Sequence, residues 1–174
     1  MKFNKLIPVI ALVLFAQGVF AQQTRSGSGP QEVPNISDPR LQVSLPDVKG
    51  DSVLLASFKG KVILLDFWAS WCMPCRAANK KLVKVYSKYK PLGFEIFGVS
   101  LDESKKDWIK AIAKDKISWV QVIEGGNSWE AKTVQQWAIS AIPTSFLVNK
   151  KGDIVAMNLE PDELEKALKE LLAE

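Results

Sequence analysis

The two cysteines of this 174-residue chain, Cys72 and Cys75, lie three residues apart, and the chain has no histidine. Residues at this spacing on a helix lie about 5–6 Å apart, which is within the range that a disulfide bridges. The spacing therefore indicates two sulfurs that form and break a disulfide with each other, which is the chemistry of thiol–disulfide exchange.

A purely structural disulfide is the first alternative. A ring closed over so few residues stabilises a fold by only about 2 kcal/mol in the chain-entropy model, and a domain of this length can build a core without a cross-link. A structural zinc site needs four ligands, and a copper site with two cysteines also needs histidine. Since the chain lacks histidine, both metal sites are disfavoured and redox chemistry is the favoured interpretation.

The segments on either side of the pair predict how the sulfurs are held. Residues 61–68 are a nearly unbroken apolar run, which is typical of a central parallel strand covered on both faces. Residues 76–86 have the apolar spacing of a helix. Cys72 is then expected at the start of that helix, where backbone N–H groups and the dipole favour a thiolate. Cys75 lies one turn further in, and Pro74 occupies an early position that needs no hydrogen-bond donor.

The rest of the chain predicts an α/β fold. We expect an N-terminal β-hairpin over 41–55, strands over 62–68, 94–100, 120–122, 144–149 and 154–157, and helices over 104–114, 129–136 and 162–172. A βαβ half followed by a ββα half gives a central mixed β-sheet flanked by helices. Five lysines are interpreted as the solvated face of the cysteine-bearing helix: Lys80, Lys81, Lys84, Lys88 and Lys90.

Residues 1–21 have the pattern of a secretory signal peptide, with Lys2 and Lys5 before a short apolar stretch and small residues at its end. We expect cleavage after Ala21, with an uncleaved membrane tether as the alternative. The protein is then exported, and the predicted location is the bacterial periplasm, where disulfides can form.

Residues 22–40 are rich in Gln, Ser, Gly and Pro and predict a flexible linker, and residues 41–174 predict one domain. The formal net charge of +4 falls to +2 when the two lysines of the signal peptide are removed. This balance, without a basic run interleaved with aromatics, argues against nucleic-acid binding. We expect a monomer that needs no cofactor.

Two segments resemble a known superfamily. Residues 66–75 read DFWASWCMPC, and residues 141–144 read AIPT before a predicted strand. The first is similar to the thioredoxin active-site signature almost position for position, and the second resembles the cis-proline loop of thioredoxins. The hairpin before the cysteines, and a stretch from Val99 to Pro143 long enough for an extra helix and strand, resemble the exported TlpA/ResA-type thiol–disulfide oxidoreductases. The resemblance covers about residues 41–173 and implies a thioredoxin-like fold.

The resemblance also implies a mechanism. Cys72 attacks a partner disulfide, a mixed disulfide forms, and Cys75 resolves it. Asp66 is a carboxylate in an apolar strand, which is costly to bury without a task or a partner. The resemblance implies that Asp66 exchanges protons with Cys75, which burial favours by raising its pKa. A solvated or hydrogen-bonded strand aspartate is the alternative.

The residues implied in substrate binding lie around the sulfurs. Trp71 is expected to form part of the docking surface, and Met73 and Pro74 lie between the sulfurs, where they tune the redox potential. Pro143 is expected to be cis and to pack beside the disulfide. The backbone of Ile142 is expected to pair with a substrate strand.

One departure from the family pattern concerns proton transfer. Many TlpA/ResA relatives carry a glutamate three residues past the second cysteine, and this chain has Ala78 there. Any acid–base role therefore falls to Asp66 or to water.

The leading hypothesis is an exported reductase of protein disulfides. It would act on a partner such as apocytochrome c and be re-reduced by a membrane thiol-electron donor. An oxidant that introduces disulfides is one alternative, and a non-catalytic binding module or chaperone is another. A peroxidase is disfavoured, because residues 69–71 lack the threonine that peroxiredoxins carry before their cysteine. The direction of electron flow stays open.

Overall fold

A computed structural model describes residues 38–126 and 128–173. The predicted signal peptide and residues 22–37 of the predicted linker lie outside these described residues. Within the two described ranges, no helix is both long and apolar enough to cross a membrane.

The described chain begins with a short 3₁₀ turn, Pro39–Gln42, slightly before the predicted domain start at Leu41. Gln136 Nε2 donates to Pro39 O at 2.6 Å, and Trp137 Nε1 donates to Arg40 O at 3.1 Å. These bonds join the turn to the helical region more than ninety residues further along, so packing of the domain includes residues just before 41.

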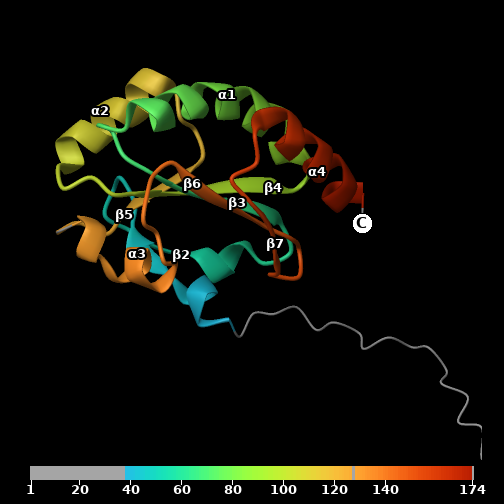
Figure 1. Cartoon of the computed structure of the whole chain (residues 1–174), viewed down its shortest axis with the longest axis horizontal. Coiled ribbons are helices and arrows are strands. Elements are labelled where there is room, and N and C mark those ends of the chain that lie inside the picture. The colour runs from blue at the N-terminus through green and yellow to red at the C-terminus, as the bar shows by residue number, and fades with distance from the viewer. Residues whose placement is uncertain (1–37, 127, 174) are drawn as a thin grey trace, which may run out of the picture. The chain divides into compact units, whose positions relative to one another are not determined.

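A five-stranded mixed sheet forms the centre of the domain, in the order β5-β4-β3-β6-β7 (Figure 1). Strands β4 and β5 run parallel to β3, whereas β6 is antiparallel to β3 and β7 to β6. The strands are β3 Val62–Trp68, β4 Phe94–Ser100, β5 Val120–Ile123, β6 Thr144–Val148 and β7 Ile154–Met157. The predicted mixed sheet flanked by helices is confirmed.

The predicted N-terminal hairpin is confirmed as a separate two-stranded sheet of β1 (Ser44–Pro46) and β2 (Ser52–Leu54). The Asp47 carboxylate in its turn accepts hydrogen bonds from the backbone N–H groups of Lys49, Gly50 and Asp51. An isolated bridge between Asp47 and Val122 joins the hairpin to the edge strand β5.

Helices cover the two faces of the sheet unequally. Helices α1 (Met73–Tyr89), α2 (Lys105–Asp115) and α4 (Pro161–Ala173) lie on one side, whereas α3 (Lys132–Gln136) and the hairpin lie on the other (Figure 1). Short 3₁₀ turns complete the fold at Leu55–Phe58, Lys90–Leu92 and Ser128–Glu130. The helix predicted over 129–136 is thus two pieces, because the extended backbone of Ala131 (φ −55°, ψ 138°) interrupts it.

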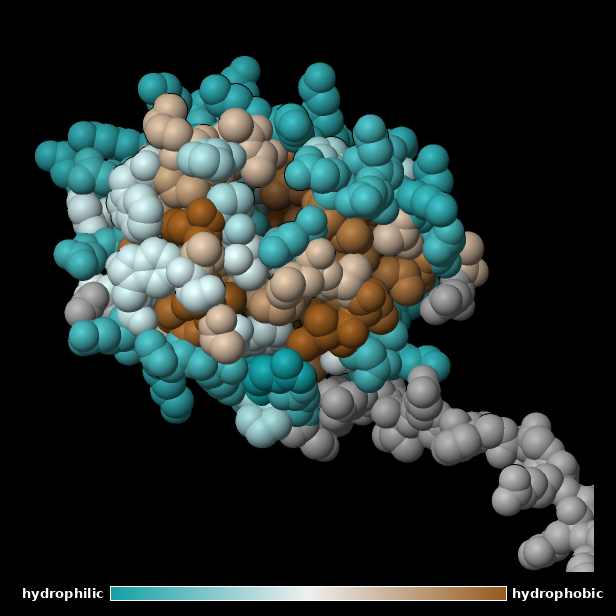
Figure 2. All heavy atoms as spheres, viewed as in Figure 1, coloured by the Kyte–Doolittle hydropathy of each residue, from teal (hydrophilic) through white to brown (hydrophobic). Residues whose placement is uncertain are grey.

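Helix α1 buries one face and exposes the other. Its buried residues include Leu82, Val85 and Tyr86 at helical spacing. The five lysines predicted to form a solvated face are all exposed, and the side of the molecule formed by α1 is largely hydrophilic (Figure 2). This amphipathic pattern holds α1 on the sheet and so fixes the place of its first turn.

Strand β3 is buried along its whole length, as predicted for a central strand. Its side chains alternate between the two faces of the sheet. Phe67 packs against Trp137 and Phe146 on the α3 side, with ring centroids 6.3 Å away in each case. Leu64 and Asp66 instead line a groove with α1 residues on the opposite side. The strand therefore carries one carboxylate into the layer beneath α1.

Candidate active site

The two cysteines form a disulfide at the first turn of α1. Cys72 is the N-cap residue, and its Sγ accepts a hydrogen bond from the backbone N–H of Cys75 at 3.2 Å. Both are buried, Cys72 at 6% exposed and Cys75 at 1%. The prediction that Cys72 begins the helix and Cys75 lies one turn in is confirmed. An N–H group directed at Cys72 Sγ, together with the helix dipole, favours the thiolate there.

Asp66 lies beneath this turn, in the middle of β3, and is 6% exposed. Burial raises the pKa of its carboxyl group to about 7. A carboxyl with such a pKa can both take and give a proton near neutral pH, which is what a general acid–base requires.

A groove of about 460 Å³ reaches Asp66. Pro74 and Pro143 also line this groove, so the structure brings three of the predicted site residues together. Ala78, the departure from the family pattern described above, lines it too. Lys81 and Glu160 are the other charged residues among those that line the groove.

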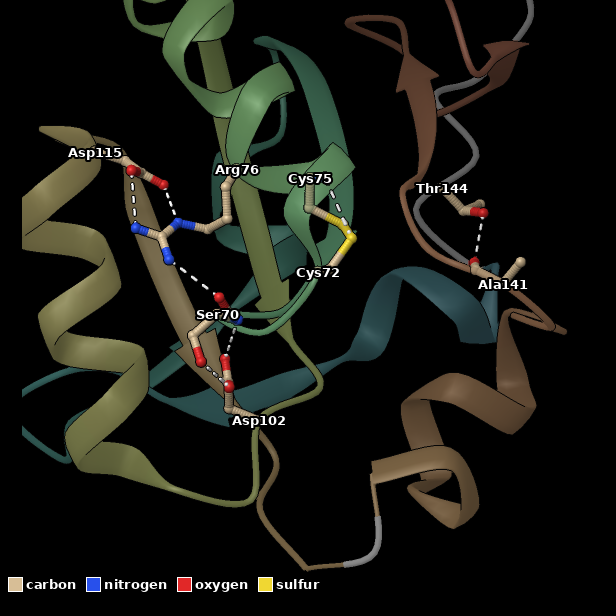
Figure 3. Close-up of a disulfide and its surroundings, with 8 residues drawn as sticks. All are labelled: Ser70, Cys72, Cys75, Arg76, Asp102, Asp115, Ala141 and Thr144. Atoms are coloured by element: carbon tan, nitrogen blue, oxygen red, sulfur yellow. Dashed lines mark hydrogen bonds and ion pairs between the residues drawn. A yellow bond between two sulfur atoms is a disulfide. The ribbon is translucent and has the colours of Figure 1, made fainter.

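The loop that carries Pro143 lies beside the end of β3. Thr144 pairs with Phe67 in the sheet, and Thr144 Oγ1 donates to Ala141 O at 2.8 Å across the loop (Figure 3). The peptide bond between Ile142 and Pro143 is cis. The antiparallel pairing of β6 with β3 therefore fixes this loop at the strand end that leads into the cysteines.

The surface next to the disulfide is apolar. Met73 is 73% exposed and Trp71 is 54% exposed, and Pro74 and Pro143 are exposed as well. Ile142 is partly buried and packs against the core. Exposed apolar residues around a buried reactive group favour contact with a protein partner.

Sequence reasoning missed a cluster of polar residues beside the pair, which we call the loop anchor: Ser70, Arg76, Asp102 and Asp115. Ser70 N and Ser70 Oγ donate to the Asp102 carboxylate at 2.8 and 2.5 Å (Figure 3). Arg76 Nη1 donates to Ser70 O at 3.0 Å, while Nε and Nη2 donate to the two carboxylate oxygens of Asp115. One signal was available, because the carboxyl ends of parallel strands meet at one edge of a sheet, and Asp102 follows β4 there.

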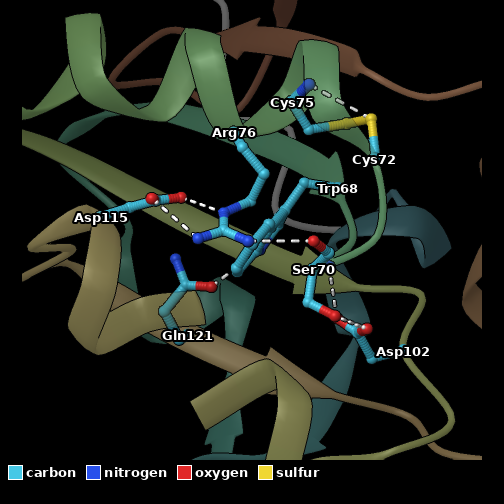
Figure 4. Close-up of polar contacts among 8 residues, drawn as sticks. All are labelled: Trp68, Ser70, Cys72, Cys75, Arg76, Asp102, Asp115 and Gln121. Atoms are coloured by element: carbon cyan, nitrogen blue, oxygen red, sulfur yellow. Dashed lines mark hydrogen bonds and ion pairs between the residues drawn. A yellow bond between two sulfur atoms is a disulfide. The ribbon is translucent and has the colours of Figure 1, made fainter. Parts of the chain in front are cut away.

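A second buried contact supports the end of β3. Trp68 Nε1 donates to Gln121 Oε1 of β5 at 2.8 Å (Figure 4). The intervening strand contributes Gly98, which pairs with Gln121. A Cβ atom at Gly98 would lie 2.8 Å from both Cδ and Oε1 of Gln121. The missing side chain at Gly98 therefore makes room for the Gln121 amide beneath α1.

We expect Gly98→Ala to destabilise the protein by about 1–3 kcal/mol, because displacing Gln121 leaves the buried Trp68 N–H without its acceptor. Urea unfolding measures this change. In the Gln121→Ala background the same Gly98→Ala change should cost much less, since no amide remains to be displaced. Equal costs in both backgrounds would contradict the steric explanation.

Among the described residues, no group of three or more His, Cys, Asp or Glu side chains is placed to hold a metal ion. The site contains the Cys72–Cys75 disulfide, the buried Asp66 and exposed apolar residues around them.

The fold and the sulfur pair define a thioredoxin-like thiol–disulfide oxidoreductase. The chain belongs to the Redoxin family, whose pattern matches residues 30–172.

Known relatives carry the same activity in their names. A thiol–disulfide oxidoreductase ResA from Bacillus cereus is 29% identical over 184 residues, covering 99% of this chain and 97% of the relative. Among solved structures, the thioredoxin domain of a thiol–disulfide oxidoreductase from Bacteroides vulgatus is 38% identical with a TM-score of 0.69, covering 75% of this chain and 92% of the other. A structure described as a thiol:disulfide interchange protein DsbE from Chlorobium tepidum is 29% identical with a TM-score of 0.64. The match covers 75% of this chain and 90% of the other. The resemblance to ResA-type oxidoreductases is confirmed.

Proposed function

We propose that this oxidoreductase works as a reductase of protein disulfides outside the cytoplasm. The observation that carries the proposal is the Cys72–Cys75 disulfide at the N-terminus of α1, framed by exposed apolar residues. Exposed apolar residues around the disulfide fit a protein substrate, whereas a small-molecule disulfide would need no docking surface.

Charge around the pair supports the reducing direction. Asp66 lines the same groove as Pro74 of the first turn of α1, and Asp102 binds Ser70, two residues before Cys72. The guanidinium of Arg76 is already paired with Asp115. Carboxylates oppose a nearby thiolate, which makes the reduced form less favourable. Strong oxidants of this kind owe their potential to a stabilised reduced form, so the opposite balance favours a reductase.

The reaction starts from the dithiol form. The Cys72 thiolate attacks one sulfur of a partner disulfide, a bond forms between the two sulfurs, and the other partner sulfur leaves as a thiolate that takes up a proton. Cys75 then loses its proton and attacks Cys72 Sγ, which breaks the mixed disulfide and releases the second partner thiol. Two electrons pass to the partner, and the enzyme ends as the disulfide seen in this structure.

Asp66 is proposed as the base for the second step. Cys75 is buried behind Cys72, so solvent reaches it poorly, while the groove connects Asp66 with the surface. A carboxylate whose pKa is raised to about 7 can accept the Cys75 proton and release it through the groove. Because an alanine, Ala78, lines the groove wall, this task falls to Asp66 or to water in the groove.

Docking and cellular setting follow from the remaining predictions. We propose that the exposed side chains of Trp71, Met73 and Pro74 contact the partner, while the Ile142 backbone pairs with a partner strand beside Pro143.

The signal-like pattern of residues 1–21 supports export to the periplasm. Apocytochrome c is the proposed example of a substrate, and a membrane dithiol donor is proposed to restore the reduced form.

Equilibration with glutathione tests the direction of electron flow. We expect a reduction potential near that of thioredoxin, about −270 mV, because the carboxyl groups of Asp66 and Asp102, in the groove and loop next to the first turn of α1, disfavour the thiolate. The oxidised fraction can be measured by alkylation and mass spectrometry over a series of glutathione ratios. A value near −120 mV, typical of strong oxidants, would instead make the protein a disulfide-introducing enzyme.

A further inference from the structure

The short loop between β3 and α1 is held by side chains from other parts of the fold. This loop, residues 69–71, leads directly into Cys72, and all three polar groups of Ser70 are hydrogen-bonded to side chains from outside the loop. Its N–H and hydroxyl bind Asp102, and its carbonyl binds Arg76 (Figures 3 and 4). Such complete bonding of one loop residue by side chains indicates a loop with a fixed position.

Each member of the loop anchor is itself held. Asp102 is 2% exposed, and its carboxylate also accepts from Ser100 Oγ of β4 at 2.7 Å. Asp115, at the end of α2, is buried and binds Arg76 through both oxygens. The hydrogen bond between Arg76 and Asp115, together with the negative charges of Asp115 and Asp102, raises the pKa of Arg76 above its usual value. The anchor thus ties the loop to β4, α1 and α2 together.

We propose that Asp102 and Arg76 are positioning residues that hold Cys72 Sγ over the first turn of α1 when the disulfide is open. The proposal rests on the thiol–disulfide exchange described above and not on its direction. In the oxidised form the S–S bond itself holds Cys72 to α1. In the reduced form that bond is gone, and the path from β3 through Ser70 to Cys72 is what keeps the sulfur near the Cys75 N–H.

This difference between the two redox forms has a measurable consequence. Loosening the anchor should weaken the hold on the Cys72 thiolate in the reduced form and change little in the cross-linked form. The reduced form then becomes less favourable relative to the disulfide. A residue that merely supported the fold would destabilise both forms alike, so the redox equilibrium would not move.

Arg76 allows geometry to be separated from charge. Its guanidinium binds Ser70 O and both oxygens of Asp115 at once. A lysine keeps the positive charge but lacks the planar fork that makes these three bonds. If charge alone acted on Cys72, Arg76→Lys would behave like the wild type, whereas loss of the fork should loosen the loop.

The test uses Ser70→Ala and Arg76→Lys, with Ser57→Ala as a matched control. Ser57 is exposed and its Oγ makes one hydrogen bond to Leu54 O. It belongs neither to the loop anchor nor to the groove that reaches Asp66, so its loss should leave the redox pair unchanged. For both anchor variants we expect slower alkylation of Cys72 at pH 7 and a higher Cys72 pKa. The equilibrium with glutathione should shift about three- to tenfold toward the disulfide, where tenfold corresponds to about 30 mV.

Unfolding of both redox forms of each variant completes the design. Equal destabilisation of the two forms, with an unchanged glutathione equilibrium and unchanged Cys72 pKa, would overturn the proposal and leave the anchor a structural feature. A wild-type response in Arg76→Lys alone would overturn the role of its fork. Neither result would affect the proposed reductase function, which the wild-type potential decides separately.

Discussion

Replacement of Cys72 by alanine is expected to abolish disulfide reduction, lowering kcat/KM by about 10³-fold or more. Cys72 carries the sulfur at the helix start, where the Cys75 N–H and the helix dipole favour its thiolate, and no other cysteine of the chain occupies such a position. Reduction of insulin with dithiothreitol as the electron source measures the loss.

Cys75→Ala is the matched variant, because it removes the resolving sulfur and keeps the nucleophile. We expect it to accumulate a mixed disulfide with its partner, visible on a non-reducing gel and identifiable by mass spectrometry. Expression of this variant in the exporting cell should capture the physiological substrate. Turnover that survives in Cys72→Ala, or equal trapping by both variants, would contradict the assigned roles and favour the binding-module alternative.

Asp66→Asn is expected to remove a large dependence of stability on pH. The pKa of Asp66 rises from 3.8 to about 7 on folding, so the folded protein binds this proton more tightly than the unfolded chain. Stability therefore falls as pH rises from about 4 to about 7 and is constant above that range. The difference in pKa corresponds to about 4 kcal/mol, so Asp66→Asn should be the more stable protein at pH 8.

The same variant should slow the second step of exchange. Without a base at this position, the Cys75 proton has to leave through water, and the mixed disulfide should persist longer near pH 7. Urea unfolding of the oxidised protein between pH 4 and 8, together with stopped-flow measurement of partner release, checks both effects. Glu160→Gln is the control, since Glu160 lines the same groove but is exposed. A wild-type pH dependence in Asp66→Asn would show that another group is responsible.

The elements that hold the cysteines could be predicted from the sequence because each has a strong local pattern. The apolar run before Cys72 predicts the limits of β3. The lysine-rich amphipathic pattern after Cys75 predicts the helix α1 and which of its faces is exposed to solvent. A carboxylate inside that apolar run also stood out, since burying Asp66 without a reason is costly. Local patterns were sufficient here, because the strand, the turn and the helix are consecutive in the chain.

The loop anchor could not be predicted in the same way, because its members are distant in sequence. Asp102 and Asp115 lie 32 and 39 residues from their partners, Ser70 and Arg76. An aspartate after a strand and another at a helix end are common on protein surfaces, and the burial of these two follows only from tertiary packing, in which α2 contacts α1. Ala78 stands out in the sequence as a departure from the family pattern, but its place in the groove wall depends on distant segments, residues 143–161, that line the other side.

Cys72 Sγ is at once the atom that reacts and the cap of α1. Helices are usually capped by an oxygen that stays unchanged throughout the life of the protein. Here the cap changes its chemical state at each step, from a thiolate that accepts a strong hydrogen bond to a disulfide sulfur that accepts a weak one. The end of the helix therefore reports the oxidation state of the protein. A partner that contacts this turn can distinguish the reduced enzyme from the oxidised one.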